Sequence, residues 1–504
     1  MAPLYTSFTL QSSLIGLGGV FVLLLIVVEY QSLSYLVGLA VYNLYFHPLA
    51  IYPGPRMCAI TRIPFLWALV QGKQTHNLRK LHKIYGDVVR IAPNELSYTN
   101  PSAWKDIYAH RQGKPEMGKY RTLYSEHPGA DHIVIADREN HSRLRKSLSH
   151  GFSEASMRQQ ESLIQRYVDL LMRGLEQNSN DGQTPLNMCS WYNWTTFDII
   201  GDLTFGEPFG CLENSTYHPW VSMIMDSIKL GAYMQALRYV PFGRKLAMLL
   251  VPKKLVAKKK AHHEMTIEKV KRRVELKEER ADFLGSVLKR RGEGFTFPEL
   301  VSNSSILIFA GSETTATALS GMTYYILKNP SSMATLVHEV RSAFSHNDEI
   351  TINSVGNLKY MLACINETLR MFPPAPVGFP RVVPEGGDLV AGKWVPAGTV
   401  VGVSMLATYH SPDNFHDPDF YIPERFLGDP RFVNDSKIAL NAFSLGPRNC
   451  IGKNLAYAEM RLIMAKMLFN FDLELDDGRD WDHQRSYTTW EKHPLNVKLK
   501  KVVR

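Results

Sequence analysis

The sequence has little of what would define a disulfide-rich, repetitive or disordered protein. Its five cysteines are odd in number and scattered, at positions 58, 189, 211, 364 and 450. This usage excludes a disulfide scaffold and favours a reducing compartment. The chain has no low-complexity tract and no repeat at solenoid or propeller periods, and its 45% hydrophobic and 21% charged residues are ordinary for a globular protein.

Basic residues are in excess, but they are not arranged as a nucleic-acid-binding module. The formal net charge of +9 is modest for 504 residues. Because Lys and Arg are not interleaved with a recognisable module, we expect no nucleic acid as a partner. An anionic membrane surface and a negatively charged redox protein suit this charge better.

Charged side chains are absent from residues 1–28, and Leu14–Val28 is almost unbroken apolar sequence. Glu29 interrupts, and Leu33–Phe46 is apolar again. The first stretch is near the lower length limit for spanning a bilayer, and the second is shorter. A cleaved signal peptide is the alternative, but the basic n-region and a small-x-small cleavage site before Glu29 are both missing.

The first positive charges follow these apolar stretches, which places the bulk of the chain on the cytosolic side of a membrane. Tyr52-Pro53-Gly54-Pro55 then ends any helix, since proline lacks the backbone donor and restricts the preceding residue. The sequence therefore predicts a membrane anchor over residues 1–50 and a separate globular body over residues 51–504. Whether residues 33–46 also span the membrane or lie in its interface stays open.

One cysteine stands in a run with specific chemistry, FSLGPRNCIG from Phe443 to Gly452. A helical pattern follows over Asn454–Phe469, so the Cys450 thiol lies at a helix N-terminus, where the backbone dipole favours the thiolate. Gly452 lets a large flat ligand approach the backbone, and Arg448 can meet an anionic group on it. A thiolate held in this way suits the proximal ligand of haem iron.

The same residues are compatible with two other roles for Cys450. A lone cysteine is most often a small buried hydrophobic residue. Zinc is disfavoured, because no second Cys or His lies within ligand spacing of Cys450. The run matches F-x-x-G-x-R-x-C-x-G at every fixed position, and in this it resembles the haem-binding signature of the cytochrome P450 superfamily. The resemblance implies haem b (iron protoporphyrin IX), with Cys450 as its axial ligand and Arg448, Phe443 and Gly452 around it.

Upstream, the long helical pattern Asn303–Leu327 contains the run AGSETT, which ends in Glu313, Thr314 and Thr315. Glycine and hydroxyl side chains loosen the backbone ladder, so we expect a kink there. A plain core helix with polar residues on its wet face is equally compatible with the residues alone. The run resembles the oxygen-activating helix of the same superfamily, which implies that the Thr315 hydroxyl and the Glu313 carboxylate deliver protons.

Two further motifs carry charge. Glu367 and Arg370 are three residues apart on one helix face, and Arg425 follows in the run PERF. By resemblance these three form a structural network that locks the fold around the haem-binding loop. His141 and Arg145 stand at i and i+4, where the superfamily has a partner of the haem propionates, and Arg381 falls where it has another.

The motifs occur in the order of the cytochrome P450 superfamily, and the resemblance covers essentially residues 50–504. Three stretches resemble a narrower group within the superfamily, the fungal microsomal members of secondary metabolism of the isotrichodermin-hydroxylase and averantin-hydroxylase type. These stretches are Tyr85–Ser97, Pro380–Gly387 and Gly446–Glu459. That implies a mostly α fold with a small β region behind an N-terminal membrane anchor. It also implies the endoplasmic reticulum membrane, with the haem-thiolate monooxygenase domain, residues 51–504, on its cytosolic face.

The activity implied is insertion of one oxygen atom from O₂ into a lipophilic terpenoid or polyketide. The electrons come from NADPH through cytochrome P450 reductase, with cytochrome b5 as a further candidate partner, and Arg143, Lys146 and Lys453 could receive the reductase. A haem-thiolate isomerase or peroxide-using enzyme without a reductase is a second hypothesis, which the retained Glu313 and Thr315 disfavour. An inactive haem- or lipid-binding membrane protein is the third.

Overall fold

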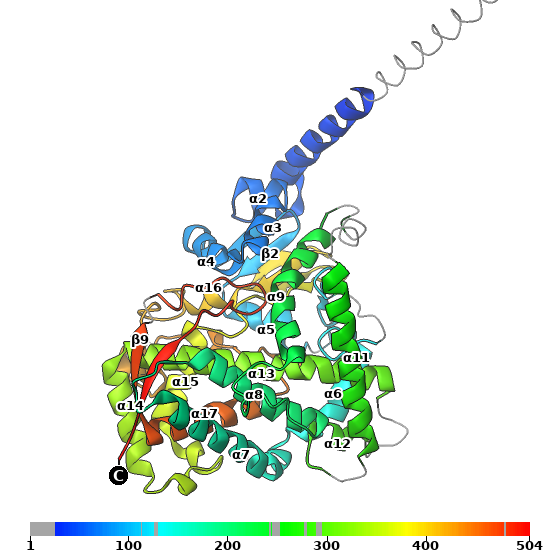
Figure 1. Ribbon diagram of the computed structural model, residues 1–504. Coiled ribbons are helices and arrows are strands. Elements are labelled where there is room, and N and C mark those ends of the chain that lie inside the picture. Colours follow the sequence, from blue (N-terminus) through cyan, green and yellow to red (C-terminus); the bar gives the residue numbers. More distant parts are fainter. Residues whose placement is uncertain are drawn as a thin grey trace, which may run out of the picture.

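The computed structural model describes residues 26–503 apart from 112, 125–129, 241–242, 244–252, 277–279, 289–294 and 478–479. The body is mostly helical, with its sheets gathered toward one side (Figure 1). The prediction of a mostly α fold with a small β region is confirmed.

Residues 26–41 form a helix that extends away from the body (Figure 1), followed by the π-helical turn η1 (Tyr42–Phe46). Its apolar side chains are exposed, as at Leu33 (60%), Leu36 (59%) and Phe46 (73%). Within the described part of the chain, no helix combines the length and apolar character needed to cross a membrane. Most of the predicted first apolar stretch, residues 14–25, lies outside the described residues.

Helices make up most of the body. The α-helices are α2 (Arg56–Ile60), α3 (Ile63–Val70), α4 (Gln74–Tyr85), α5 (Ser102–Tyr108), α6 (Arg138–Leu148), α7 (Glu154–Ser179), α8 (Met188–Phe205), α9 (Pro219–Arg238), α11 (Lys253–Glu275), α12 (Phe283–Leu288), α13 (Phe297–Lys328), α14 (Pro330–Ala343), α15 (Lys359–Met371), α16 (Met405–Tyr409) and α17 (Lys453–Asn470). The short helical turns are η2 (Pro48–Ile51), η3 (Ser149–Phe152), η4 (Asn347–Glu349), η5 (Ser354–Asn357), η6 (Pro423–Phe426), η7 (Pro430–Phe432), η8 (Lys437–Ala439) and η9 (Gly446–Arg448).

The strands form three small sheets. Their bounds are β1 (Val88–Ala92), β2 (Glu95–Tyr98), β3 (Gly118–Lys119), β4 (Leu186–Asn187), β5 (Arg381–Val382), β6 (Asp388–Val390), β7 (Lys393–Val395), β8 (Val400–Val403), β9 (Phe471–Asp477) and β10 (Asn496–Lys501). The largest sheet has the order β1-β2-β8-β5-β3, in which β2 and β8 are parallel and the other pairs antiparallel. The others are β4-β10-β9 and the hairpin β6-β7.

Helix α13 runs through the centre of the body and packs against α8, α15 and α17. It begins with a capping box, in which Thr296 and Glu299 satisfy each other's backbone N–H groups. A Cβ atom at Gly311 would lie 2.7 Å from Ile200 Cδ1, so glycine permits the close crossing of α13 over α8. Helix α8 itself is buried almost all round, as expected of a core helix.

The expected interruption of α13 does not appear as a break, since the helix continues from Phe297 to Lys328. Within it, Thr314 Oγ1 donates a hydrogen bond of 2.6 Å to the carbonyl of Ala310, one turn earlier. A side-chain bond of this kind competes with the helix's own ladder. The predicted loosening of the backbone ladder by hydroxyl side chains is therefore confined to this turn and does not interrupt the helix.

Candidate active site

The loop that carries Cys450 is shaped by a tight turn. Gly446 has φ +71°, and a Cβ atom there would lie 2.0 Å from the Tyr108 carbonyl oxygen, so no larger residue fits between this turn and α5. The Cys450 N–H donates to the Phe443 carbonyl at 2.8 Å, which closes the loop. Helix α17 starts three residues later, at Lys453.

Cys450 differs from the other four cysteines in its surroundings. Those at 58, 189, 211 and 364 are buried in the core, whereas Cys450 is exposed. Desolvation by the surrounding protein still raises the pKa of its thiol, while the Gly452 N–H and the charges of Arg145 and Lys453 act in the opposite direction. The thiol thus faces an open space inside the protein. A metal ion that coordinates a thiol deprotonates it outright, so a bound cation would overcome the effect of burial.

One face of α13 is also left uncovered. Ala310 is exposed in the middle of this central helix, and Ile306 and Thr314, one turn on either side, are half-buried. The spacing of four places these three residues on one helix face. Helix α13 packs on α17, which starts directly after the Cys450 loop. The uncovered face and the exposed thiol provide room for a flat apolar group.

Basic side chains converge beside this space. They come from β3, α6, β5 and the cysteine loop, and they are Lys119, His141, Arg145, Arg381 and Arg448. Burial, reinforced by the charges of the other four, lowers the pKa of His141 to about 3. Burial together with Arg448 and Arg381 lowers the pKa of Lys119 to about 6, although Glu116 opposes this. The neighbouring charges thus disfavour protonation of His141 and Lys119, and an anionic ligand would relieve this repulsion.

Arg448 and Arg145 both have partners within the protein. Arg448 is ion-paired to Glu116 and donates to the Ala136 carbonyl at 3.0 Å. Arg145 donates to the Asn449 carbonyl at 2.6 Å, which ties α6 to the residue before Cys450. These bonds use only some of the five guanidinium donors, so further acceptors can be bound.

Arg381 lies between two aromatic side chains. It donates to the Tyr124 hydroxyl at 3.3 Å, and its guanidinium carbon lies 5.4 Å from the centre of the Tyr108 ring. Arg381 is 6% exposed, and buried cations of this kind favour an anionic partner.

Haem b fits this arrangement of residues. It requires an axial thiolate, a slot for a flat macrocycle and cations for two propionates. Cys450 can hold the iron, the uncovered face of α13 can cover the ring, and the five converging cations can meet the propionates. Gly452 is compatible with this, since a Cβ atom there would meet the protein only at an ordinary 3.8 Å from Phe152. The Phe443 ring packs against the Tyr457 ring beside the loop, with 5.2 Å between the ring centres.

Glu313 does not lie on the uncovered face of α13. Its side chain is fully buried and forms an ion pair with Lys492, whose side chain is 3% exposed. Lys492 Nζ also donates to Thr317 Oγ1 at 2.8 Å. The second carboxylate oxygen of Glu313 is buried and has no hydrogen-bond partner among the described residues.

Thr315 is likewise turned away from the uncovered face. It is 3% exposed and lies near Glu459 of α17, a fully buried carboxyl whose pKa burial raises to about 8 while the Thr315 hydroxyl lowers it. The prediction that Thr315 supplies the hydroxyl on the oxygen side therefore does not fit its position. Successive helical residues are rotated by about 100°, and this rotation puts Thr314 rather than Thr315 on the face of Ala310.

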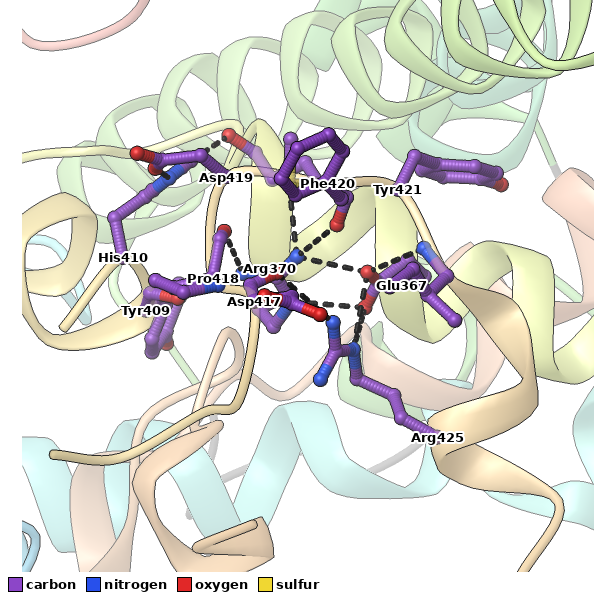
Figure 2. A network of polar contacts seen from close by, with 12 residues as sticks. Glu367, Arg370, Tyr409, His410, Asp417, Pro418, Asp419, Phe420, Tyr421 and Arg425 are labelled. Carbon is purple, nitrogen blue, oxygen red and sulfur yellow. Dashed lines mark hydrogen bonds and ion pairs between the residues drawn. The ribbon is translucent and has the colours of Figure 1, made fainter. Parts of the chain in front are cut away.

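The structure brings together the predicted trio Glu367, Arg370 and Arg425 (Figure 2). Arg370 binds Glu367 through two hydrogen bonds of 2.7 and 2.8 Å, and Arg425 Nε approaches the same carboxylate at 3.1 Å. Glu367 also accepts from the Ile422 N–H at 2.8 Å, and Arg425 pairs with Asp435 at 2.5 Å. The side chains of the trio are at most 1% exposed, so their charges depend on one another.

Arg370 extends this network to the segment that precedes the cysteine loop (Figure 2). It donates to the carbonyls of Tyr409, Pro418 and Phe420 at 2.8, 2.6 and 2.9 Å. The Tyr409 hydroxyl in turn accepts from the Asn441 N–H at 3.1 Å, two residues before Phe443. Helix α15 is thereby connected through three carbonyls to the entrance of the loop.

Sequence reasoning missed several residues of this site. Lys492 and Lys119 are distant from the recognised motifs, and no local pattern identifies them. Glu459 ends the recognised Gly446–Glu459 stretch, but nothing in the sequence shows that its carboxyl is buried beside Thr315. Asn449 stands inside the cysteine run, at a position that the signature leaves free, so only its bond to Arg145 reveals its role.

A haem-thiolate enzyme is the class that this fold and site define. The family model described as "Cytochrome P450" matches residues 58–500. Among curated relatives, the cytochrome P450 monooxygenase tpeC of Talaromyces stipitatus is 46% identical over 91% of either chain. Trichothecene C-15 hydroxylase of Fusarium sporotrichioides is 45% identical over 93% of this chain and 96% of its own. Averantin hydroxylase of Dothistroma septosporum is 45% identical over 91% and 88%.

The chain therefore belongs to the cytochrome P450 family, and it is a monooxygenase with a haem-thiolate cofactor. The resemblance drawn from the sequence motifs is confirmed.

Proposed function

We propose that this monooxygenase hydroxylates a lipophilic secondary metabolite of the terpenoid or polyketide type, using O₂ and electrons from NADPH through cytochrome P450 reductase. The observation that carries the substrate class is the 45% identity to two relatives named as hydroxylases of a trichothecene and of averantin. The apolar face formed by Ile306 and Ala310 agrees with an apolar substrate, since ligand pockets are lined mainly by hydrophobic side chains.

When bound, haem supplies the activation of O₂, and the residues of this chain supply position, exclusion of water and protons. Cys450 holds the iron, and Arg381 and Arg448 with their neighbours hold the propionates. Thr314, hydrogen-bonded to Ala310, presents a hydroxyl on the uncovered face, and Glu313 lies next to it in the chain. We assign proton delivery to Glu313 and Thr314 and give Thr315 a packing role beside Glu459.

The test of the function combines a spectrum with turnover. We expect the reduced, CO-treated enzyme to show the red-shifted Soret band of thiolate ligation, and product to form only with NADPH and reductase. Comparative metabolite profiling of a deletion strain identifies the substrate as the compound that accumulates. Product formation that needs peroxide but no reductase would contradict the proposal.

Exchanging the two threonines separates their roles. We expect Thr314→Ala to raise the peroxide released per NADPH consumed and to lower product formation by about 10²-fold, because general acid catalysis contributes on that order. Thr315→Val keeps the shape of the buried side chain and should change product formation by less than about threefold. Peroxide release, NADPH consumption and product are measured with reductase and the identified substrate. A larger loss of product formation in Thr315→Val than in Thr314→Ala would show that Thr315, not Thr314, delivers the proton.

Electron supply requires a surface that accepts an acidic reductase. Of the three basic residues expected there, Arg143 is ion-paired to Glu299, whereas Lys146 and Lys453 are exposed. We assign the docking of the reductase to Lys146 and Lys453, near the start of α17 and the cysteine loop.

We also propose that residues 1–50 anchor the chain to the endoplasmic reticulum membrane, with the catalytic domain on the cytosolic face. The exposed apolar side chains of residues 26–46 support this, because such side chains are stable in contact with lipid. The protease accessibility of a tag at each end in microsomes tests this orientation.

A further inference from the structure

The ion pair between Glu313 and Lys492 joins two distant parts of the chain at the centre of the protein. The two residues are 179 positions apart, and the side chains are 0% and 3% exposed. Thr317 Oγ1 accepts from Lys492 at 2.8 Å and donates to the Glu313 carbonyl at 2.7 Å. Lys492 is therefore bound to both the Glu313 carboxylate and the Thr317 hydroxyl of α13, and these two contacts fix its ammonium group in place.

Lys492 also lines a pocket of about 220 Å³ between α8, α9 and the C-terminal segment. Polar groups surround this pocket, among them Asn193, Tyr217 and Glu491. Asn193 donates to the Tyr217 hydroxyl at 3.1 Å, while its own carbonyl oxygen is buried without a partner among the described residues. The pocket has both apolar and polar walls, and the unpartnered Asn193 oxygen gives a water molecule in it an acceptor.

Glu313 is connected to this pocket through its ion pair with Lys492. One carboxylate oxygen is held by Lys492, and the other is buried and unpartnered among the described residues. Thr314, the next residue, lies on the uncovered face. The carboxylate is therefore held by a residue that lines the pocket, and its second oxygen can accept a proton.

We propose that Lys492 is a positioning residue for Glu313, and that the pocket it lines is the route by which solvent protons reach that carboxylate. The proposal rests on the proposed function, since the protons are those consumed in oxygen activation. A proton moves from pocket water to the Glu313 carboxylate. It then passes toward the Thr314 hydroxyl, and Glu313 returns to its ionised form beside Lys492. Neither residue is altered after a turnover, and no electron is transferred.

A set of variants tests this role. We expect Lys492→Met to slow NADPH consumption with reductase by about tenfold and to increase the slowing caused by D₂O, because proton delivery becomes limiting. Lys492→Arg keeps the charge and should stay within about twofold of the wild type. Lys498→Met, which removes a surface lysine paired with Asp476 at 3.0 Å, is the matched control and should change neither rate.

The double variant Glu313→Gln/Lys492→Met decides whether Lys492 acts through Glu313. We expect it to be no slower than Glu313→Gln alone, because residues that act as one unit are not additive. Losses that multiply in the double variant would overturn the proposal. The double variant also leaves neither charge unpaired, so it can be measured even if Lys492→Met fails to fold.

Infrared difference spectra provide a readout that does not require turnover. In Lys492→Met a buried Glu313 without its counter-ion should take up a proton and show a carboxylic acid band that is absent from the wild type and from the double variant. Absence of this band from folded Lys492→Met, together with an unchanged D₂O effect, would overturn the role of Lys492. Failure of the proposed function would instead appear in the wild type, as a missing thiolate spectrum or turnover without reductase, and leave the infrared band intact.

Discussion

Cys450→Ser is expected to abolish the red-shifted Soret band of the reduced, CO-treated enzyme and to lower product formation below detection. A serine hydroxyl does not replace a thiolate as iron ligand, and the electron donation that favours O–O cleavage is lost with the sulfur. Absorbance spectra and product assays with reductase measure both effects on the same preparation.

The matched control for this change is Cys58→Ser. Cys58 is 6% exposed and lies in α2, which packs on η1, α3 and β1, so the spectrum should be unchanged. Monooxygenation that survives Cys450→Ser would contradict the assignment of the iron ligand. Loss of the spectrum in both variants would show that the assay reports folding rather than ligation.

Arg370→Ala should give protein with almost no bound haem and a free energy of unfolding lower by about 3–5 kcal/mol, because it leaves the buried Glu367 charge with only part of its partners. It also removes three hydrogen bonds to the carbonyls of Tyr409, Pro418 and Phe420, which position the segment before the cysteine loop. The haem-to-protein absorbance ratio and the urea midpoint of the purified protein measure the two effects.

Arg431→Ala provides the comparison for Arg370→Ala. Arg431 is also paired with an acidic residue, Asp429, at 2.7 Å, but its side chain is 65% exposed. Water screens the charges of an exposed pair, so this variant should keep its haem and its urea midpoint. A normal haem content in Arg370→Ala would show that the network does not maintain the haem-binding loop.

Residues contiguous in sequence were predicted well. The cysteine run identified its loop and the helix after it because a turn and a helix start depend on neighbouring residues. Glu367 and Arg370 are one helical turn apart, so helix geometry alone brings them together, and the PERF motif supplied Arg425.

Features that depend on how helices are rotated were predicted poorly. A run such as AGSETT gives the spacing of its side chains, but only the packing of α13 against α8 and α17 decides which of them faces the open space. The rotation buries Thr315 beside Glu459 and leaves Thr314 half-exposed. Residue identity alone does not distinguish two adjacent threonines.

By itself, then, the sequence determined the family and its haem-thiolate chemistry and predicted Cys450 as the ligand, because these are encoded in short runs whose geometry is local. Only the tertiary structure decided which threonine faces the site, how the five cations converge, and that Lys492 meets Glu313 across 179 residues. The physical reason is that burial and charge pairing are set by segments distant in the chain. The energy of a buried charge depends on what the fold brings next to it.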